Sequence, residues 1–166
     1  MSLSRLTTRS LLKWLARIFR FGLAAFFLFT AIAKLVVISA FTQNVGELLT
    51  ASGFDPQRWS WPVTAMVIVA EITIAILLLL RRTVRLGAIA AALLLLGFAG
   101  FALFYVYVLK GEPLECGCFG GIIASQLGVS TALRNLALII PAIIVWLGYR
   151  PKMIVTQIPV SNPATV

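Results

Sequence analysis

Residues 86–109 read LGAIAAALLLLGFAGFALFYVYVL, an uninterrupted stretch without a charged side chain. A helix needs roughly 20 predominantly apolar residues to cross the hydrocarbon core of a bilayer. Three further runs approach this length, at about 21–40, 61–80 and 131–148. The sequence therefore predicts an all-α integral membrane protein, built as a bundle of four transmembrane helices.

The composition agrees with this prediction and excludes a soluble domain. Hydrophobic residues make up 61% of the chain and charged residues 11%, with a mean hydropathy of +1.03. Soluble domains are nearer to about half apolar and about a quarter charged. We expect a basic amphipathic N-terminal segment (1–20) that lies along the inner interface before turning into the membrane. A four-helix membrane domain (21–148) and a disordered cytoplasmic tail (149–166) should follow.

The net charge of +9 is a topology signal, and its distribution argues against nucleic-acid binding. Basic residues precede the first span, fill the loop after the second and follow the fourth; four of the five acids lie in the two remaining loops. Because loops rich in Lys and Arg stay cytoplasmic, both termini should be cytoplasmic. The basic residues in these three places are Arg5, Arg9, Lys13, Arg17, Arg20, Arg81, Arg82, Arg85, Arg150 and Lys152, and the four acids are Glu47, Asp55, Glu112 and Glu115.

The chain has two cysteines, Cys116 and Cys118, separated by Gly117 in a polar, glycine-rich loop. The predicted topology places this loop on the periplasmic side of a bacterial inner membrane, where disulfides form and persist. A pair spaced C-x-C can close a small strained ring, and strained exposed disulfides are the labile, exchanging kind. Redox exchange is the favoured interpretation. A purely structural loop is the second, and a metal site is the third, since the chain has no histidine and would need a dimer to complete it.

Three charged residues could support this chemistry. Arg134, with Ser130 or Thr131 as helix N-cap, could favour a thiolate at the cysteines, or pair with an acid of the loop or a lipid phosphate. Glu71 lies midway along the second span and Lys34 in the outer half of the first. They could form an ion pair inside the bundle; alternatively Lys34 extends to the interface and Glu71 is neutral. A structural role and a proton-relay role both remain open for them.

The third span should be central in the bundle, because small residues let membrane helices approach closely. The aromatic residues at its outer end favour an interfacial belt over a ring-binding pocket. Residues 41–60 are predicted to form a loop, with a turn at Ser52–Pro56. The small residues are Gly87, Ala88, Ala91, Ala92, Gly97 and Gly100, and the aromatic ones Phe101, Phe104, Tyr105 and Tyr107.

The order of these residues resembles that of the methylamine-utilisation protein MauE family, within the DoxX-like group of four-helix membrane proteins. The resemblance covers roughly residues 17–148, and its most specific part is the string from Glu115 to Gly120 followed by Arg134-Asn135. The other matching features are Arg20, residues 31–35, Phe41, Pro62, Glu71 and the basic loop after Leu80.

The resemblance implies disulfide handling during maturation of an exported client, in the family a methylamine-dehydrogenase subunit, beside a membrane-anchored thioredoxin-like protein. Cys116 and Cys118 would be the catalytic pair, with Arg134, Glu71 and Lys34 in support. It also leaves quinone open as a cofactor, although similar four-helix disulfide-generating enzymes use a second cysteine pair that this chain lacks. A membrane thiol–disulfide oxidoreductase is thus one hypothesis. A non-catalytic subunit or assembly factor of a larger membrane complex, or a homodimer, is the alternative, and solute transport past Glu71 is a weaker third.

Overall fold

The computed structural model describes residues 3–109 and 128–149, with side chains from Leu11 onward. This part of the chain forms helices and no β-strand. Four helices contain a stretch long and apolar enough to cross a membrane, namely α1, α3, α4 and α5. The prediction of an all-α bundle with four spans is confirmed. The helices are α1 (Leu3–Val36), α2 (Ile38–Ala51), α3 (Pro56–Leu79), α4 (Val84–Tyr107) and α5 (Val129–Gly148).

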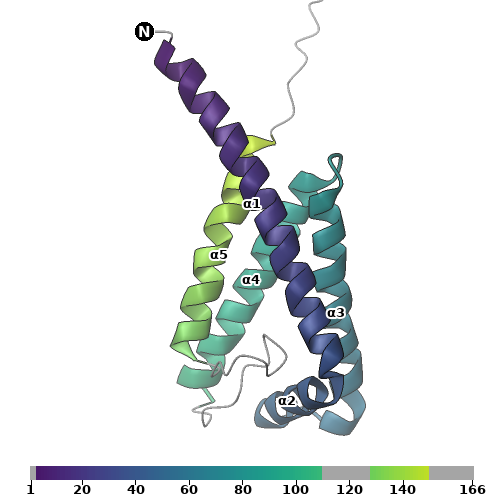
Figure 1. Cartoon of the computed structure of the whole chain (residues 1–166). Coiled ribbons are helices and arrows are strands. Elements are labelled where there is room, and N and C mark those ends of the chain that lie inside the picture. The colour runs from purple at the N-terminus through teal and green to yellow at the C-terminus, as the bar shows by residue number, and fades with distance from the viewer. Residues whose placement is uncertain (1–2, 110–127, 150–166) are drawn as a thin grey trace, which may run out of the picture.

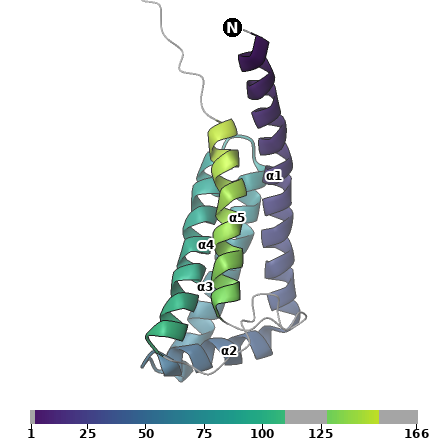
Figure 2. The ribbon, with the colours of Figure 1, turned by 90° about the vertical axis from the view of Figure 1, so that its left-hand side faces the viewer.

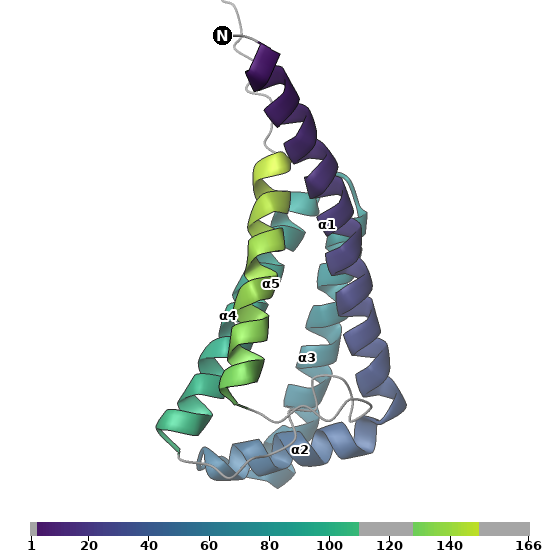
Figure 3. The ribbon, with the colours of Figure 1, turned by 60° about the vertical axis from the view of Figure 1, so that its left-hand side comes forward.

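The four spanning helices form a ring in which each packs against two others (Figure 1). Helix α4 packs against α3 and α5, and α1 completes the ring by packing against the same two helices. The short helix α2 packs mainly on α3 and lies across one end of the bundle (Figure 2). The N-terminal part of α1 extends beyond the opposite end, close to where α5 finishes (Figure 3). The bundle therefore has two different ends, one covered by α2 and one carrying the start of α1.

Large apolar side chains cover the outside of the ring. Met66 on α3, Leu93 on α4 and Leu133 on α5 are each about two-thirds exposed, at 65%, 65% and 67%. A contiguous apolar surface of this kind is unusual on a soluble monomer. In a bilayer these side chains contact lipid tails, while the helices satisfy their backbone hydrogen bonds internally.

Helix α4 approaches its neighbours closely, although it is not central. A Cβ atom added at Gly87 would lie 2.9 Å from the backbone nitrogen of Leu78, so only glycine allows this contact with α3. The small side chains of Ala88 and Ala91 are fully buried on the same helix. However, α4 packs against two of the other spanning helices, α3 and α5, and each of the other spanning helices also packs against two. The expected central position is thus wrong, because small residues set the distance to a neighbour rather than the number of neighbours.

Helix α1 runs without a break through Arg20, so the turn expected after the basic N-terminal segment is absent. Arg20 is only 4% exposed. Its guanidinium donates to the backbone carbonyls of Leu78 and Leu79, at the end of α3, and to the hydroxyl of Tyr149. These carbonyls have no partner within their own helix, because a helix ends with unpaired acceptors. Arg20 therefore links α1 to the end of α3 and to Tyr149, the residue that follows α5.

The segment predicted as a loop at 41–60 contains a helix instead. Helix α2 places Phe41 and Val45 in the interior, with Leu48 half-buried on the same side, which is the spacing of one helical face. The predicted turn follows it. Gly53 has a φ of 81°, a conformation that suits glycine. Asp55 then caps α3 by accepting a hydrogen bond from the backbone N–H of Gln57 at 3.0 Å.

The basic loop after α3 and two exposed acids lie at opposite ends of the described bundle. Arg81 and Arg82 follow α3 at the end where Arg20 holds the carbonyl of Leu79. The exposed acids Glu47 and Asp55 belong to α2 and to the turn after it. A loop rich in arginine at one end of the bundle is the feature that orients a membrane protein. Which end is cytoplasmic stays a prediction.

Candidate functional site

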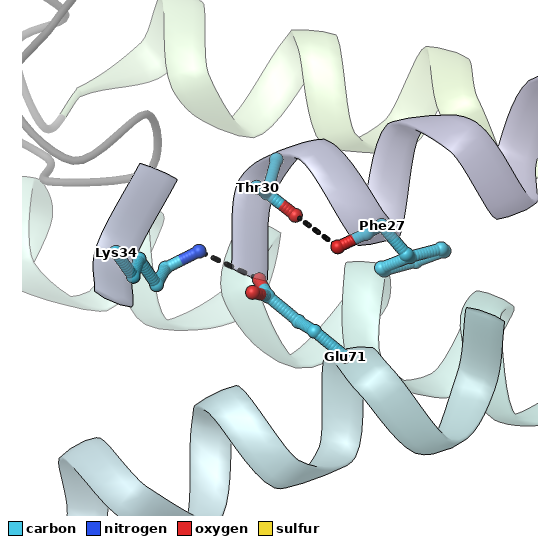
Figure 4. Close-up of polar contacts among 4 residues, drawn as sticks. All are labelled: Phe27, Thr30, Lys34 and Glu71. Atoms are coloured by element: carbon cyan, nitrogen blue, oxygen red, sulfur yellow. Dashed lines mark hydrogen bonds and ion pairs between the residues drawn. The ribbon is translucent and has the colours of Figure 1, made fainter. Parts of the chain in front are cut away.

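Lys34 from α1 and Glu71 from α3 point toward each other inside the bundle (Figure 4). Lys34 Nζ lies 2.7 Å from Glu71 Oε1, and the two side chains are only 4% and 3% exposed. The sequence left open whether Lys34 pairs with Glu71 or extends toward the interface, and the structure shows the pair. Lys34 Nζ also lies 5.4 Å from the centre of the Phe41 ring, in cation–π range.

The ion pair forms part of the wall of a cavity of about 280 Å³. All five described helices contribute to the lining, and α2 contributes residues from Phe41 to Leu49, followed by Ser52 just after the helix. The cavity therefore lies between the spanning helices, on the side of the bundle that α2 covers. Most of its lining is apolar: Phe26, Phe27, Phe41, Val45, Leu48, Leu49, Phe54, Val63, Val67, Leu95, Phe98 and Phe101.

A few polar side chains interrupt this apolar lining, and two of them present unpaired atoms. Glu71 Oε2 and Asn135 Nδ2 are buried and have no hydrogen-bond partner among the described residues. The nearby Thr30 hydroxyl donates to the backbone carbonyl of Phe27 at 3.0 Å (Figure 4). Buried polar atoms are normally hydrogen-bonded, so each unpaired atom calls for an explanation. Among its described lining residues, the cavity thus has one acceptor atom and one donor atom without a hydrogen-bond partner.

The first turns of α5 bring Thr131, Arg134 and Asn135 to the cavity. The helix begins at Val129, with Gly128 in the N-cap position and no side-chain cap. The expectation that Ser130 or Thr131 caps this helix is therefore wrong, since both lie inside its first turn. Arg134 is partly exposed and Asn135 is 5% exposed.

A family model described as methylamine utilisation protein MauE matches residues 12–148. The chain belongs to the MauE family. The matched range begins next to the start of the membrane-crossing part of α1 and ends at the last residue of α5. It therefore includes the whole described lining of the cavity in this MauE family member. No curated protein and no solved structure matches the chain.

Three of the five residues singled out from the sequence lie together in this MauE family member. Lys34, Glu71 and Arg134 all line the cavity, although they come from α1, α3 and α5. The other two, Cys116 and Cys118, lie outside the described residues. The structure thus supports the grouping of the three charged residues and leaves the role of each as a prediction.

The described residues on either side of the cysteine segment lie at the α2 end of the bundle. Leu109, the last described residue after α4, packs in a small cluster with Leu48 of α2 and Ala132 of α5. Gly128, where the description resumes, precedes Thr131 of the cavity lining by less than one helical turn. The chain therefore leaves α4 and enters α5 beside the cavity.

The sequence offered two roles for the aromatic residues at the end of α4, an interfacial belt and a ring-binding pocket. Phe104 and Tyr107 are exposed at 44% and 67%, as an interfacial belt requires. Phe101, which is also exposed, lines the cavity together with Phe98. Tyr105 is 3% exposed and packs in the cluster that contains Leu48. The end of α4 thus carries exposed aromatic side chains as well as aromatic side chains that line the cavity, and the interfacial role of the exposed ones stays a prediction.

Sequence reasoning missed the aromatic wall that α1 contributes. Phe27, Thr30 and Lys34 are spaced three and four residues apart and so share one face of the helix. Because a membrane helix is apolar on every side, this face does not stand out in composition. The polar residues Thr30 and Lys34 were the available signal.

Proposed function

We propose that this member of the MauE family takes part in thiol–disulfide exchange through Cys116 and Cys118, on the outer side of a bacterial inner membrane. The observation that carries the proposal is the position of Leu109 and Gly128 at the α2 end of the bundle. The segment with the two cysteines of the chain begins and ends there, beside a cavity with charged side chains in its wall. The basic residues at the opposite end support an outward-facing α2 end.

The exchange we propose is a two-step transfer between dithiols. A thiolate of an exported client attacks the Cys116–Cys118 disulfide, forms a mixed disulfide and releases the other cysteine as a thiolate. The second client thiolate then attacks the mixed disulfide. The client ends with a disulfide, and the pair ends as two thiols that take up the protons the client has lost. The disulfide of a thioredoxin-like partner would reoxidise the pair by the same two steps.

The charged residues of the cavity would support this chemistry from the side of the bundle. Arg134 lies on α5 less than two helical turns after Gly128, and a cation close to a cysteine lowers the energy of its thiolate. Lys34 and Glu71 would hold α1 to α3 beneath the exchange site, because their ion pair joins the two helices. Their role is thus to position helices, or to move protons, rather than to contact the client.

The test is the disulfide state of exported proteins in cells that carry Cys116→Ser, Cys118→Ser or both. Each single variant should lose client oxidation, because one cysteine cannot form the disulfide that the client attacks. The variant that keeps the cysteine that attacks the partner's disulfide should accumulate a mixed disulfide with the thioredoxin-like partner on a non-reducing gel. Ser130→Ala is a matched control, because Ser130 is exposed at the start of α5 and does not line the cavity. Unchanged client disulfides in the double variant would reject the proposal in favour of a non-catalytic subunit or assembly factor.

A further inference from the structure

The cavity beside the ion pair has room for an acyl chain of medium length. Phenylalanine and aliphatic side chains make up most of its wall. An apolar cavity of roughly 150 Å³ holds benzene, which has six carbons, so about 280 Å³ accommodates a chain of about ten to twelve carbons. The lining extends from Lys34 to Phe26 on α1, which is about 12 Å along the helix. A chain of this length can therefore lie along the bundle.

The polar side chains that α5 contributes to the wall all lie near the start of that helix. They are Thr131, Arg134 and Asn135. Asn135 is 5% exposed, and its Nδ2 is a buried donor without an acceptor among the residues that the structure describes. The helix begins without a side-chain cap, and the start of a helix carries a partial positive charge. This end of the cavity thus favours an oxygen atom that accepts hydrogen bonds.

The charges of the described lining add up to a single positive charge. Lys34 and Glu71 balance each other at 2.7 Å, and Arg134 is the third charged residue of the wall. Because Lys34 already holds the Glu71 carboxylate, the ligand needs no donor for that side chain. The polar end of a ligand in this cavity is therefore an anion rather than a cation.

Other classes of ligand fit these features less well. A hydrocarbon chain without a polar end would leave Asn135 Nδ2 buried and unpaired. A small hydrophilic anion would lose its hydration against the apolar wall. Asn135 lies six residues after Val129, about 9 Å into α5, whereas the phosphate of a phospholipid stays in the headgroup region. The carboxylate of a free fatty acid ends its chain and can follow that chain between the helices.

We propose that this cavity binds a free fatty acid of about ten to twelve carbons, with its carboxylate at the start of α5. One carboxylate oxygen accepts a hydrogen bond from Asn135 Nδ2, and Arg134 supplies the opposite charge. The chain lies against Phe27 and Leu95, which are both 1% exposed and belong to the main core cluster. The site consists of described residues alone, so it is independent of thiol–disulfide exchange.

The experiment is equilibrium binding of isotope-labelled dodecanoic acid to the full chain in phosphatidylcholine nanodiscs, with partitioning into empty nanodiscs subtracted. Binding should be saturable, and unchanged in the Cys116→Ser/Cys118→Ser variant even if thiol exchange is lost. Asn135→Leu should weaken binding about tenfold, since a hydrogen bond to a charged group corresponds to at least that factor. Thermal unfolding checks that this variant folds.

Methyl dodecanoate separates the hydrogen bond from the charge. The ester keeps the carbonyl that accepts from Asn135 Nδ2 and carries no charge. Arg134→Gln should therefore weaken binding of the acid about tenfold and leave binding of the ester unchanged, whereas Asn135→Leu should weaken both. Equal losses of acid and ester in Arg134→Gln would overturn the proposal that the site selects an anion.

Thr64→Val is the matched control for Asn135→Leu. Thr64 Oγ1 is also buried without a hydrogen-bond partner among the described residues, but Thr64 does not line the cavity. Its replacement should leave binding of the acid unchanged. On α4, Phe98→Ala should weaken binding several-fold, whereas Phe104→Ala, on the same helix but outside the lining, should not. Equal effects of the two phenylalanine variants would place the acid outside the cavity.

Nanodiscs of phosphatidylglycerol distinguish a free fatty acid from an anionic phospholipid, which offers acyl chains and a charged phosphate in large excess. Binding of dodecanoic acid should persist in them once partitioning into empty nanodiscs of the same lipid is subtracted. Its loss would overturn the proposal and identify a phospholipid site. Absence of saturable binding in phosphatidylcholine, or equal binding by wild type and Asn135→Leu, would overturn it as well.

Discussion

Lys34 on α1 and Glu71 on α3 lie 2.7 Å apart as a buried ion pair between two membrane-spanning helices. Charged side chains at such depth are costly unless they are paired, so each residue depends on the other. The pair also forms part of the wall of the cavity toward which the first turns of α5 project Arg134 and Asn135. The same ion pair therefore holds α1 against α3 and lines the candidate site.

Replacing one residue of this pair should destabilise the protein more than replacing both. Lys34→Met leaves the Glu71 carboxylate unpaired, and Glu71→Leu leaves the Lys34 ammonium unpaired; each should reduce stability by about 3–5 kcal/mol. The double variant should recover most of this loss, because two apolar residues replace the two charges. Thermal unfolding of the four proteins in detergent measures the coupling as a double-mutant cycle. Additive losses in the double variant would show that the two side chains do not depend on each other.

Arg20 should be far more important for stability than Arg17, three residues earlier on the same helix. Arg20 is buried and donates to two carbonyls at the end of α3, whereas Arg17 is exposed. Hydrogen bonds from a charged group contribute about 1.5–3 kcal/mol, so Arg20→Ala should cost at least that much. Arg17→Ala should lie within about 0.5 kcal/mol of wild type. Chemical or thermal unfolding compares them, and equal losses would contradict the fastening role of Arg20.

Alanine substitutions at two glycines of α4 should have opposite effects on the stability of the protein. A Cβ atom at Gly87 would lie 2.9 Å from Leu78 N, whereas nothing lies within 4 Å of one at Gly97. Gly87→Ala should therefore force α3 and α4 apart and cost about 1–3 kcal/mol. Gly97→Ala should be neutral or stabilising by up to about 1 kcal/mol, because alanine favours helix. A stable Gly87→Ala protein would mean that α3 and α4 do not pack as closely as described.

The two ends of the bundle should lie on opposite sides of the membrane. In a background with Cys116→Ser and Cys118→Ser, Glu47→Cys places a single thiol on α2 and Arg82→Cys places one in the loop before α4. Both positions are exposed. A membrane-impermeant maleimide added to intact cells should label the first and not the second. Labelling in the reverse pattern would invert the topology and place the cysteine segment inside.

The sequence predicts the spanning helices well, because each run of apolar residues is as long as the bilayer is thick. It does not predict α2, a helix of 14 residues whose polar side chains make the segment look like a loop. Nor does it show that α1 continues through Arg20, whose guanidinium donates to backbone carbonyls at the end of α3. Both errors come from contacts between elements rather than from the elements themselves.

The sequence predicts only part of the candidate site, because the site also depends on contacts between helices. Lys34 and Glu71 stand out because charged residues are rare within apolar runs, and their similar depths suggest a pair. Phe27, Phe98 and Asn135 could not be assigned to a shared cavity, because that requires the rotation of each helix about its axis. Asn135 is recognisable as part of the Arg134-Asn135 motif, but its unpaired amide appears only once α5 is packed.

The redox state of Cys116 and Cys118 in intact cells tests the proposed exchange most directly. A membrane-impermeant maleimide should label the pair only after mild reduction, and a non-reducing gel should show a cysteine-dependent mixed disulfide with a second protein. Thiols that label without reduction and never form a disulfide or an adduct would contradict the account. An absence of labelling even after reduction would contradict the outward position of the pair.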